Sequence, residues 1–288
     1  MINSFKELGY AVIKGGVSHE LISDCLADSS RLLEKNKSEL LRRGLLVNDR
    51  LFRVVNFHLI SRAARSLFSK SSHEALNLVD HVLGKGCVYT SLYFESGSEQ
   101  PLHRDTPYFW TNPPYSYLGF WIALENVGEE NGMLTLIEKS HSAGEPDIVN
   151  MRRERFLDKA CPMSDDKLFY EYNSAVLRMC DAAGLKQINL PMEKGDILIW
   201  DASTLHGGTP HINKNMSRKS IVFHLTPVNV PVKYMDYFFH PERVMPRRSD
   251  WNFYSDGGRE YAQHKAFSFM HKIDLPIGSV SEEFELEW

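Results

Sequence analysis

The sequence predicts a mainly β fold with flanking helices, because short runs of β-branched and aromatic residues alternate with turn residues. Five runs that are typical of strands lie at residues 88–94, 117–124, 133–137, 196–200 and 220–226. Turn-forming residues separate them, among them Ser96-Gly97, Asn112-Pro113-Pro114, Asn131-Gly132 and Gly207-Gly208. Many short strands with turns between them favour an antiparallel barrel or a double-sheet jelly roll.

Further elements are predicted before the first of these strands. Residues 10–13 read as a short strand. Apolar residues at helical spacing follow Ser18, whose side chain is a candidate N-cap. Residues 73–83 predict a second helix, which ends at Gly84.

Two longer segments depart from the strand pattern. A helical insertion occupies residues 144–187, and its clearest helical pattern is 166–181, with Ser164 as a possible N-cap. We expect the insertion to form either a lid over the barrel mouth or an outer buttress. The tail, residues 228–288, is rich in aromatic residues and proline. Such a tail packs on its own domain or forms a subunit interface, so a homodimer through the tail is an alternative.

Composition and charge exclude several classes of protein. The net charge of −4 gives no general reason to expect nucleic-acid or anionic-membrane binding. No signal-peptide core and no long apolar run appear, so we expect no membrane span and a cytoplasmic location. The four cysteines have no CxxC spacing, which argues against a zinc knuckle or a redox pair.

Two histidines and an aspartate form a candidate metal-binding set. His103 and Asp105 are two residues apart, so on an extended segment their side chains point to the same face. His206 follows the apolar run that begins at Gly195-Asp196, and we expect it to end that strand at the barrel mouth. Two imidazoles and one carboxylate bind Fe(II) on one face and leave the opposite positions open.

Arg218 is the fourth candidate, twelve residues after His206. A hairpin between them would turn the guanidinium inward, where a buried charge needs a carboxylate partner. A bound organic diacid would supply that carboxylate in the bidentate geometry that arginine favours. His240 and Glu242 form a competing pair, but they lie beside prolines and have no partner in a downstream strand.

Four blocks of sequence resemble the phytanoyl-CoA dioxygenase family of Fe(II)/2-oxoglutarate oxygenases, over most of residues 4–227. The opening Phe5-Lys-Glu-Leu-Gly-Tyr-Ala-Val-Ile-Lys-Gly and the pair His103-Arg-Asp105 are two of them. The third is the central hairpin, Trp121-Ile-Ala-Leu-Glu-Asn-Val with Glu130-Asn-Gly-Met-Leu-Thr-Leu-Ile-Glu-Lys-Ser-His141. The fourth is Gly195-Asp-Ile-Leu-Ile-Trp through Leu-His206-Gly-Gly, followed by Arg218.

The resemblance implies one oxygenase domain over residues 1–288, with a double-stranded β-helix core that is jelly-roll and cupin-like. It implies Fe(II) bound by His103, Asp105 and His206, with 2-oxoglutarate and O2 as cosubstrates. Arg218 would bind the far carboxylate of 2-oxoglutarate, and Trp121 would lie near it. The family often has Ser two residues after the distal histidine, where this chain has Gly208. Thr209 or Tyr93 is a candidate to replace that hydroxyl.

The reaction that the resemblance implies is hydroxylation of an unactivated C–H bond of a small-molecule metabolite, with release of succinate and CO2. Desaturation, epoxidation or cyclisation in natural-product biosynthesis are alternatives with the same cofactors. Related halogenases lack the carboxylate ligand, so Asp105 disfavours halogenation. A non-catalytic cupin-like binding module and an oxygenase without oxoglutarate are further alternatives. Candidate wall residues of the substrate pocket lie around and just after the ligand pair, namely Arg104, Thr106, Tyr108, Phe109 and Trp110, and the helices of the insertion are further candidates.

Overall fold

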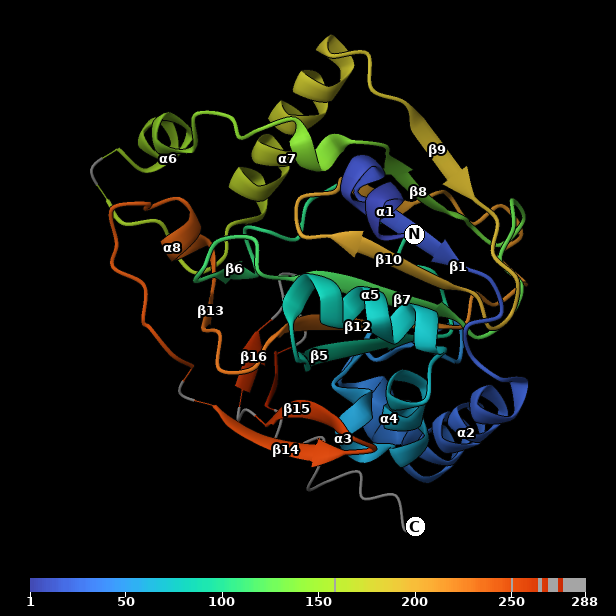
Figure 1. Ribbon diagram of the computed structural model, residues 1–288. Helices are drawn as coiled ribbons and strands as arrows, with labels where there is room; N and C mark the ends of the chain where they lie inside the picture. Colours follow the sequence, from blue (N-terminus) through green and yellow to red (C-terminus); the bar gives the residue numbers. More distant parts are fainter. Residues whose placement is uncertain (158, 250, 264–265, 269–273, 277–288) are drawn as a thin grey trace.

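The computed structural model describes residues 1–157, 159–249, 251–263, 266–268 and 274–276. Its centre is a jelly-roll core with helices packed around it, as Figure 1 shows. The larger sheet has the strand order β1-β10-β7-β12-β5-β15-β14, with β4 paired to β5. A smaller sheet has the order β11-β8-β9. The predicted fold class, mainly β with a double-stranded β-helix core, is confirmed.

The strands of the larger sheet are mostly buried. Every residue of β5, β7 and the first seven of β12 is buried, so these strands do not show the alternation of buried and exposed residues that a half-exposed sheet has. The strands of this sheet are β1 (Tyr10–Ile13), β4 (Val54–Val55), β5 (Gly86–Phe94), β7 (Leu118–Ala123), β10 (Ile197–Asp201), β12 (Ser220–Pro227), β14 (Asn252–Asp256) and β15 (Arg259–Gln263).

The remaining strands are short. The smaller sheet consists of β8 (Leu134–Ile137), β9 (Gln187–Leu190) and β11 (His206–Gly208). Three two-stranded ladders complete the set: β2 (Leu46–Val47) with β3 (Arg50–Leu51), β6 (Trp110–Thr111) with β13 (Val232–Lys233), and β16 (Ala266–Ser268) with β17 (Asp274–Pro276).

Helices surround the core, and their N-terminal caps fix where they begin. Ser18 and Ser72 accept hydrogen bonds from the backbone amides of Leu21 and Ala75, which satisfies donors that a helix start leaves free. In Figure 1, α2, α3 and α4 gather at one side of the sheet and α5 lies along it. The helices are α1 (Ile2–Leu8), α2 (His19–Arg42), α3 (Phe57–Ile60), α4 (Arg62–Ser69), α5 (His73–Leu83), α6 (Ile148–Phe156), α7 (Asp166–Ala182) and α8 (Met235–Phe238), with a 3-10 turn at Ser140–Ser142.

The predicted elements are confirmed with small shifts at their ends, and two details are wrong. The cap of α7 is Asp165, which accepts from the amide of Leu168, and not Ser164. His206 does not end the strand that begins near Gly195. That strand stops at Asp201, and a turn carries the chain into the other sheet, where His206 begins β11. The amide of Thr204 donates to the carbonyl of Asp201 within this turn, and its hydroxyl donates to the carbonyl of Gly9.

The insertion and the tail both pack on the core. Helix α7 places Phe169 in the wall of the central cavity, so the insertion forms part of that wall. In the tail, β15 pairs in parallel with β5, and Trp251 stacks on Tyr89 with ring centroids 4.5 Å apart. The described part of the tail therefore packs on its own domain, which was the first of the two expectations. Most of residues 264–288 lie outside the described residues.

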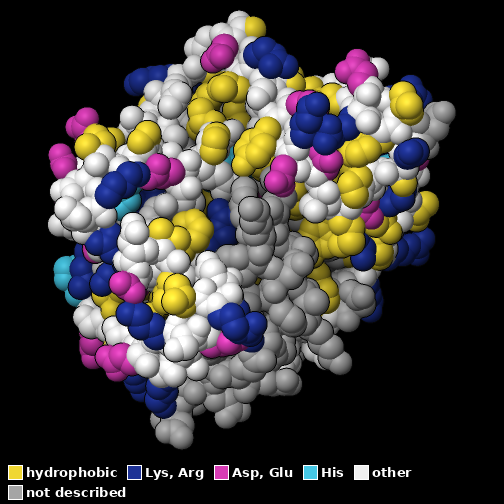
Figure 2. Space-filling view, turned by 180° about the vertical axis from the view of Figure 1, so that it is seen from behind, with side chains coloured by type: hydrophobic (Ala, Val, Ile, Leu, Met, Phe, Trp, Pro, Cys, Tyr) yellow, Lys and Arg dark blue, Asp and Glu magenta, His cyan; other side chains and the backbone are white. Residues whose placement is uncertain are grey.

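The surface mixes both signs of charge. Figure 2 shows Lys and Arg side chains interspersed with Asp and Glu over the described part of the face seen from behind. The net charge of the whole chain is −4. Among the described helices, none combines the length and the apolar character needed to cross a membrane.

Candidate functional site

His103, Asp105 and His206 meet at one point between the two sheets. The backbones of His103 and His206 exchange hydrogen bonds of 2.8 and 3.0 Å, which fixes the two ligand-bearing segments side by side. Nε2 of His103 lies 3.5 Å from Oδ1 of Asp105, and Nε2 of His206 lies 3.5 Å from Oδ2. One ligand atom from each residue lies within 4.8 Å of the others. Atoms bound about 2.1 Å from one ion lie about 3–4 Å apart, so this donor set fits a single metal ion.

Backbone carbonyls orient both imidazoles. Nδ1 of His103 lies 2.8 Å from the carbonyl oxygen of Pro101, and Nδ1 of His206 lies 3.0 Å from that of Thr204. A carbonyl only accepts, so each Nδ1 carries the proton and donates it. Each Nε2 lone pair is therefore left free to face the common point. This arrangement is typical of histidines that bind a metal.

The carboxylate of Asp105 is held by a phenol. The hydroxyl of Tyr117 donates to Oδ2 of Asp105 at 2.8 Å. Burial alone would raise the pKa of Asp105, but the nearby imidazoles of His206, His103 and His224 hold it well below its usual range. Burial lowers the pKa of His206 to about 4, against the opposing pull of Asp105. At neutral pH the aspartate is ionised and His206 is neutral, the protonation states that metal binding requires.

Arg218 lines the same cavity as this set and forms no ion pair with the described residues. The residue is 3% exposed, its amide donates to the carbonyl of Glu95, and Nη1 donates to the carbonyl of Gly132 at 3.1 Å. Nε has no hydrogen-bond partner in the described part of the chain. Burial lowers the pKa of Arg218 to about 10, so it is still a cation at neutral pH. A buried cation of this kind fits an anionic ligand.

Glycines make the space that the Arg218 guanidinium occupies. A Cβ at Gly97 would lie 2.7 Å from the guanidinium carbon, and one at Gly208 would lie 3.2 Å from Nη1. The segment from Gly97 to Gln100 packs over the guanidinium and brings Ser98 and Gln100 into the cavity wall. Neither Thr209 nor Tyr93 lines the cavity, and the hydroxyl of Tyr93 instead lies within hydrogen-bond distance of Ser29 and Glu95. Neither of them is therefore placed to replace the missing hydroxyl, and the hydroxyl-bearing residues that line the cavity in the described chain are Ser98 and Tyr108.

One cavity contains all five residues selected from the sequence. The three candidate ligands, Arg218 and Trp121 line it together. His240 lies elsewhere and contacts Arg152 and the amide of Cys161, so the competing pair joins no such cluster among the described residues. Apolar and aromatic side chains form most of the remaining wall, namely Leu92, Phe94, Tyr108, Phe109, Leu134, Phe169, Trp200 and Val222.

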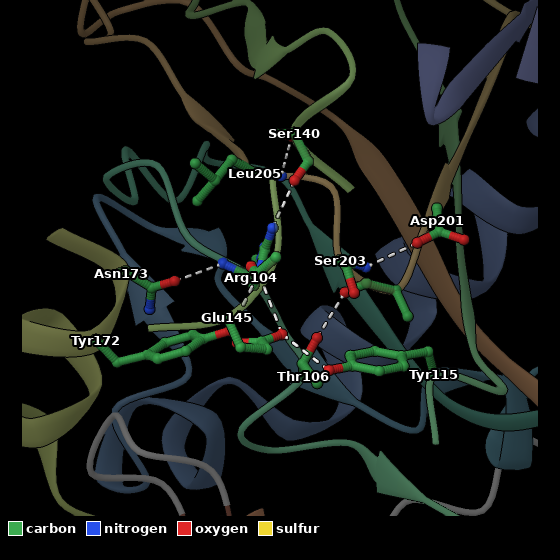
Figure 3. A network of polar contacts seen from close by, with 12 residues as sticks. Arg104, Thr106, Tyr115, Ser140, Glu145, Tyr172, Asn173, Asp201, Ser203 and Leu205 are labelled. Carbon is green, nitrogen blue, oxygen red and sulfur yellow. Dashed lines mark hydrogen bonds and ion pairs between the residues drawn. The ribbon is translucent and has the colours of Figure 1, made fainter. Parts of the chain in front are cut away.

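Part of the expected substrate wall is wrong. Tyr108 and Phe109 line the cavity, but Arg104, Thr106 and Trp110 do not. Figure 3 shows Arg104 directed into a polar network with Ser140, Glu145 and Tyr172. Because successive side chains on an extended segment alternate, the residue between two inward ligands points away from them. The hydroxyl of Thr106 donates to the carbonyl of Ala202 instead of facing the cavity.

Three residues around the metal set carry no recognisable sequence signal. Besides Tyr117, His224 places Nε2 3.8 Å from Oδ2 of Asp105, and its ring stacks on Phe109 at 4.7 Å. The indole of Trp200 packs on His206 with ring centroids 4.4 Å apart. Each of them lies in a strand or directly before one, where an aromatic or histidine residue reads as ordinary core. Only the pairing of β7, β10 and β12 brings them to the same point.

Comparison with known proteins decides the family. The profile of the family described as phytanoyl-CoA dioxygenase (PhyH) matches residues 5–220 of the 288. The chain belongs to the phytanoyl-CoA dioxygenase family. It is 26% identical over 160 residues to phytanoyl-CoA dioxygenase domain-containing protein 1 of Bos taurus, covering 52% of this chain and 47% of the relative. The Rattus norvegicus protein of that name is 27% identical over 139 residues, covering 45% and 40%. The matched part thus spans about half the length of these family members or less.

Several solved structures share this family member's fold. The epimerase SnoN, solved with Fe3+, alpha ketoglutarate and nogalamycin RO, has a TM-score of 0.62 at 17% identity and covers 91% of this chain and 96% of its own. The alpha ketoglutarate dependent carbocyclase SnoK has a TM-score of 0.58 at 18% identity and covers 85% and 90%. EctD from S. alaskensis has a TM-score of 0.55 at 17% identity and covers 78% and 75%. At these identities the likeness concerns the fold.

Proposed function

We propose that this family member is an Fe(II)- and 2-oxoglutarate-dependent oxygenase. His103, Asp105 and His206 would bind the iron, and Arg218 would bind the far carboxylate of 2-oxoglutarate. The observation that supports this most is their shared cavity, where three converging ligand atoms lie beside a buried guanidinium without a carboxylate partner in the described chain. A non-catalytic binding module has no need of this combination, and in an oxygenase without oxoglutarate Arg218 would be idle.

The chain's own residues would prepare the site for that chemistry. When bound, iron and 2-oxoglutarate supply an O2-consuming oxidative decarboxylation that releases succinate and CO2. Tyr117 and the two carbonyls that accept from the histidines hold the ligand atoms in place. Ser98 and Trp121 line the same cavity and are proposed to contact the cosubstrate. The aromatic wall would exclude water from the reacting centre.

The proposed outcome is hydroxylation of an unactivated C–H bond in a small-molecule metabolite. Asp105 fills the position whose loss is associated with halide binding, so halogenation is disfavoured. Cyclisation is the second candidate, because the structurally similar SnoK is a carbocyclase. Desaturation and epoxidation use the same cofactors and depend on where the substrate lies. The single domain, the cytoplasmic location and the homodimer through the tail remain predictions, of which light scattering of the purified chain tests the last.

Anaerobic titration with Fe(II) and 2-oxoglutarate tests the proposal. The wild-type protein is expected to develop the visible charge-transfer band of the chelate and, once O2 is admitted, to form succinate. Asp105→Ala and Arg218→Ala should lose or strongly weaken the band. Arg62→Ala, which removes an exposed arginine on α4, should keep it. A band that survives in both site variants, or a wild-type protein that forms neither band nor succinate, would refute the assignment.

A further inference from the structure

The described part of the protein buries three arginines, and only one of them has a carboxylate partner. Arg53, Arg104 and Arg218 are the buried arginines. Arg104 forms an ion pair with Glu145 at 3.2 Å and donates to two backbone carbonyls. Arg53 and Arg218 have no such ion pair among the described residues, and both line the cavity that holds the candidate metal ligands. The proposed function uses Arg218 and leaves Arg53 unexplained.

Arg53 is built into the cavity wall. It lies between β3 and β4, is 6% exposed, and has a φ of 53°, a left-handed conformation that long side chains rarely adopt. Nη2 donates to Oε1 of Gln100 at 3.2 Å, and Nε has no partner in the described chain. The guanidinium carbon lies 5.9 Å from the ring centres of Phe52 and Phe94. Burial lowers the pKa of Arg53 to about 10, and Tyr170 and Asp105 oppose this shift without forming an ion pair with Arg53 among the described residues. In the proposed function the Asp105 carboxylate binds the metal, so a neutral amide and two aromatic rings are the direct contacts left to this buried cation. The backbone conformation of Arg53 carries strain as well.

The surroundings of Arg53 differ from those of Arg218. Arg218 lies next to Gly97 and Gly208, on the side of the cavity assigned to the cosubstrate. Arg53 lies with Gln100 and Phe94, in a cavity that Phe169 of the insertion and Phe109 also line. An anion held by Arg53 would therefore have apolar and aromatic walls available for the rest of the molecule.

We propose that Arg53 binds an anionic group, a carboxylate in the first instance, of the primary substrate, whose apolar body lies against the aromatic wall. This inference rests on the proposed function and names the substrate class for the same site, an organic acid with a hydrocarbon or aromatic portion. The carboxylate that Arg53 binds could instead belong to 2-oxoglutarate, which also carries carboxylates. The experiment below distinguishes the two sources.

The test compares acids with their neutral amides in the presence of Mn(II) and saturating 2-oxoglutarate. The probes are 3-phenylpropionate with 3-phenylpropionamide and octanoate with octanamide, and calorimetry measures their binding to the wild type, Arg53→Gln and Arg53→Lys. The wild type should bind an acid about 10-fold or more tightly than its amide, the range expected of one hydrogen-bonded charge pair. Arg53→Gln should remove that preference, and Arg53→Lys should retain part of it. Arg62→Gln should leave it unchanged.

Separate measurements of 2-oxoglutarate binding complete the test. Arg53→Gln should bind 2-oxoglutarate within about twofold of the wild type, whereas Arg218→Gln should lose most of that binding. If Arg53→Gln weakens 2-oxoglutarate binding as strongly as Arg218→Gln, Arg53 serves the cosubstrate and the proposal is wrong. It is also wrong if the wild type shows no preference for acids or if Arg53→Gln keeps one. A wild type that binds no 2-oxoglutarate at all would instead refute the proposed function.

Thermal unfolding distinguishes a ligand-binding arginine from a structural one. Without ligands, Arg53→Met should unfold at the same temperature as the wild type or higher, because the substitution removes a buried charge that the described chain does not neutralise. A structural arginine would behave in the opposite way, and a clear loss of stability in Arg53→Met would contradict the proposal. Arg104→Met is the matched control, because it removes a buried cation that forms an ion pair with Glu145 and donates to the carbonyls of Ser140 and Gly144, and it should lower the unfolding temperature.

Discussion

At the scale of single residues, the hydrogen bond from Tyr117 orients the carboxylate of Asp105. The Tyr117 hydroxyl donates to Oδ2 at 2.8 Å, and burial raises the pKa of the phenol well above its usual value, so it remains a donor. Tyr117→Phe should keep the fold and lower the affinity for Mn(II) by about 10- to 100-fold, the range seen when a partner of a ligand is removed. Calorimetric titration measures this. Tyr115→Phe, whose hydroxyl contacts Glu145, is the control, and equal affinities for all three proteins would count against the role of Tyr117.

Gly119 affects the position of His206 through the packing of Trp200. A Cβ at this position would lie 2.1 Å from Cε2 of Trp200, whose indole packs on His206. Gly119→Ala should therefore push the indole toward the ligand, destabilise the protein by about 1–3 kcal/mol as overpacked cores do, and weaken Mn(II) binding. Calorimetric unfolding and Mn(II) titration measure the two effects. Gly128→Ala should show neither, because a Cβ there has no neighbour within 4 Å, and a Gly119→Ala protein that matches this control would refute the argument.

At the scale of elements, the structure shows which parts of the fold follow from local sequence. Caps and hydrophobic period predicted α5 and β1 to the residue, because those signals act over a few positions. The end of β10 was not predictable in this way. It depends on Thr204 reaching the carbonyl of Gly9, a contact across 195 residues that no local pattern encodes. The metal-ligand set was predictable because His103, Asp105 and His206 belong to short sequence motifs. Arg53 and His224 were not predictable, because only long-range packing brings them into the cavity.

Helix α7 of the insertion is tied to the ligand segment through Asn173. Its Oδ1 accepts the backbone amide of Arg104 at 2.7 Å, between the two candidate ligands of that segment, and both groups are buried. Asn173→Ala should leave that amide unpaired and cost about 1–3 kcal/mol. Chemical denaturation measures the loss, and Ser174→Ala, at the exposed next position, should cost little. Equal stabilities for the two variants would show that the contact contributes nothing.

Asp196 joins β10 to the loop after β1 and gives stability a dependence on pH. Burial would raise its pKa, but Lys14 and the amides of Gly15 and Glu193 donate to it and hold the pKa below its usual range. A lowered folded-state pKa contributes stability above the unfolded value of about 3.9, and that stability is lost as pH falls through the folded value. Asp196→Asn should thus be less stable than wild type at neutral pH.

The difference between Asp196→Asn and the wild type should shrink as the pH falls below about 4, where the wild-type carboxylate also takes up a proton. Urea unfolding at a series of pH values measures it. Asp181→Asn, an exposed position, should follow the wild type throughout. A difference that stays constant down to the lowest pH would mean that the charge of Asp196 is not what stabilises this junction.

At the scale of the whole molecule, the cavity collects buried polar and charged groups that a bound ligand would stabilise. Arg53 and Arg218 each carry a guanidinium Nε without a hydrogen-bond partner in the described residues, and three metal-type ligands converge in the same cavity. Such groups reduce the stability of the folded chain until a ligand pairs with them. Ligands that bind only the folded state stabilise it by mass action, so the site should set the unfolding temperature of the entire protein.

Mn(II) and 2-oxoglutarate should therefore raise the unfolding temperature in two separable steps. At about 100 times its dissociation constant each ligand adds about 2.7 kcal/mol, which is roughly 5 °C for a chain of this size. Differential scanning fluorimetry measures both steps. Arg218→Gln should keep the Mn(II) step and lose the 2-oxoglutarate step, whereas His103→Ala should lose both, and Arg62→Gln should keep both. If Arg218→Gln responds to 2-oxoglutarate as the wild type does, the diacid is held elsewhere and the assignment of Arg218 is wrong.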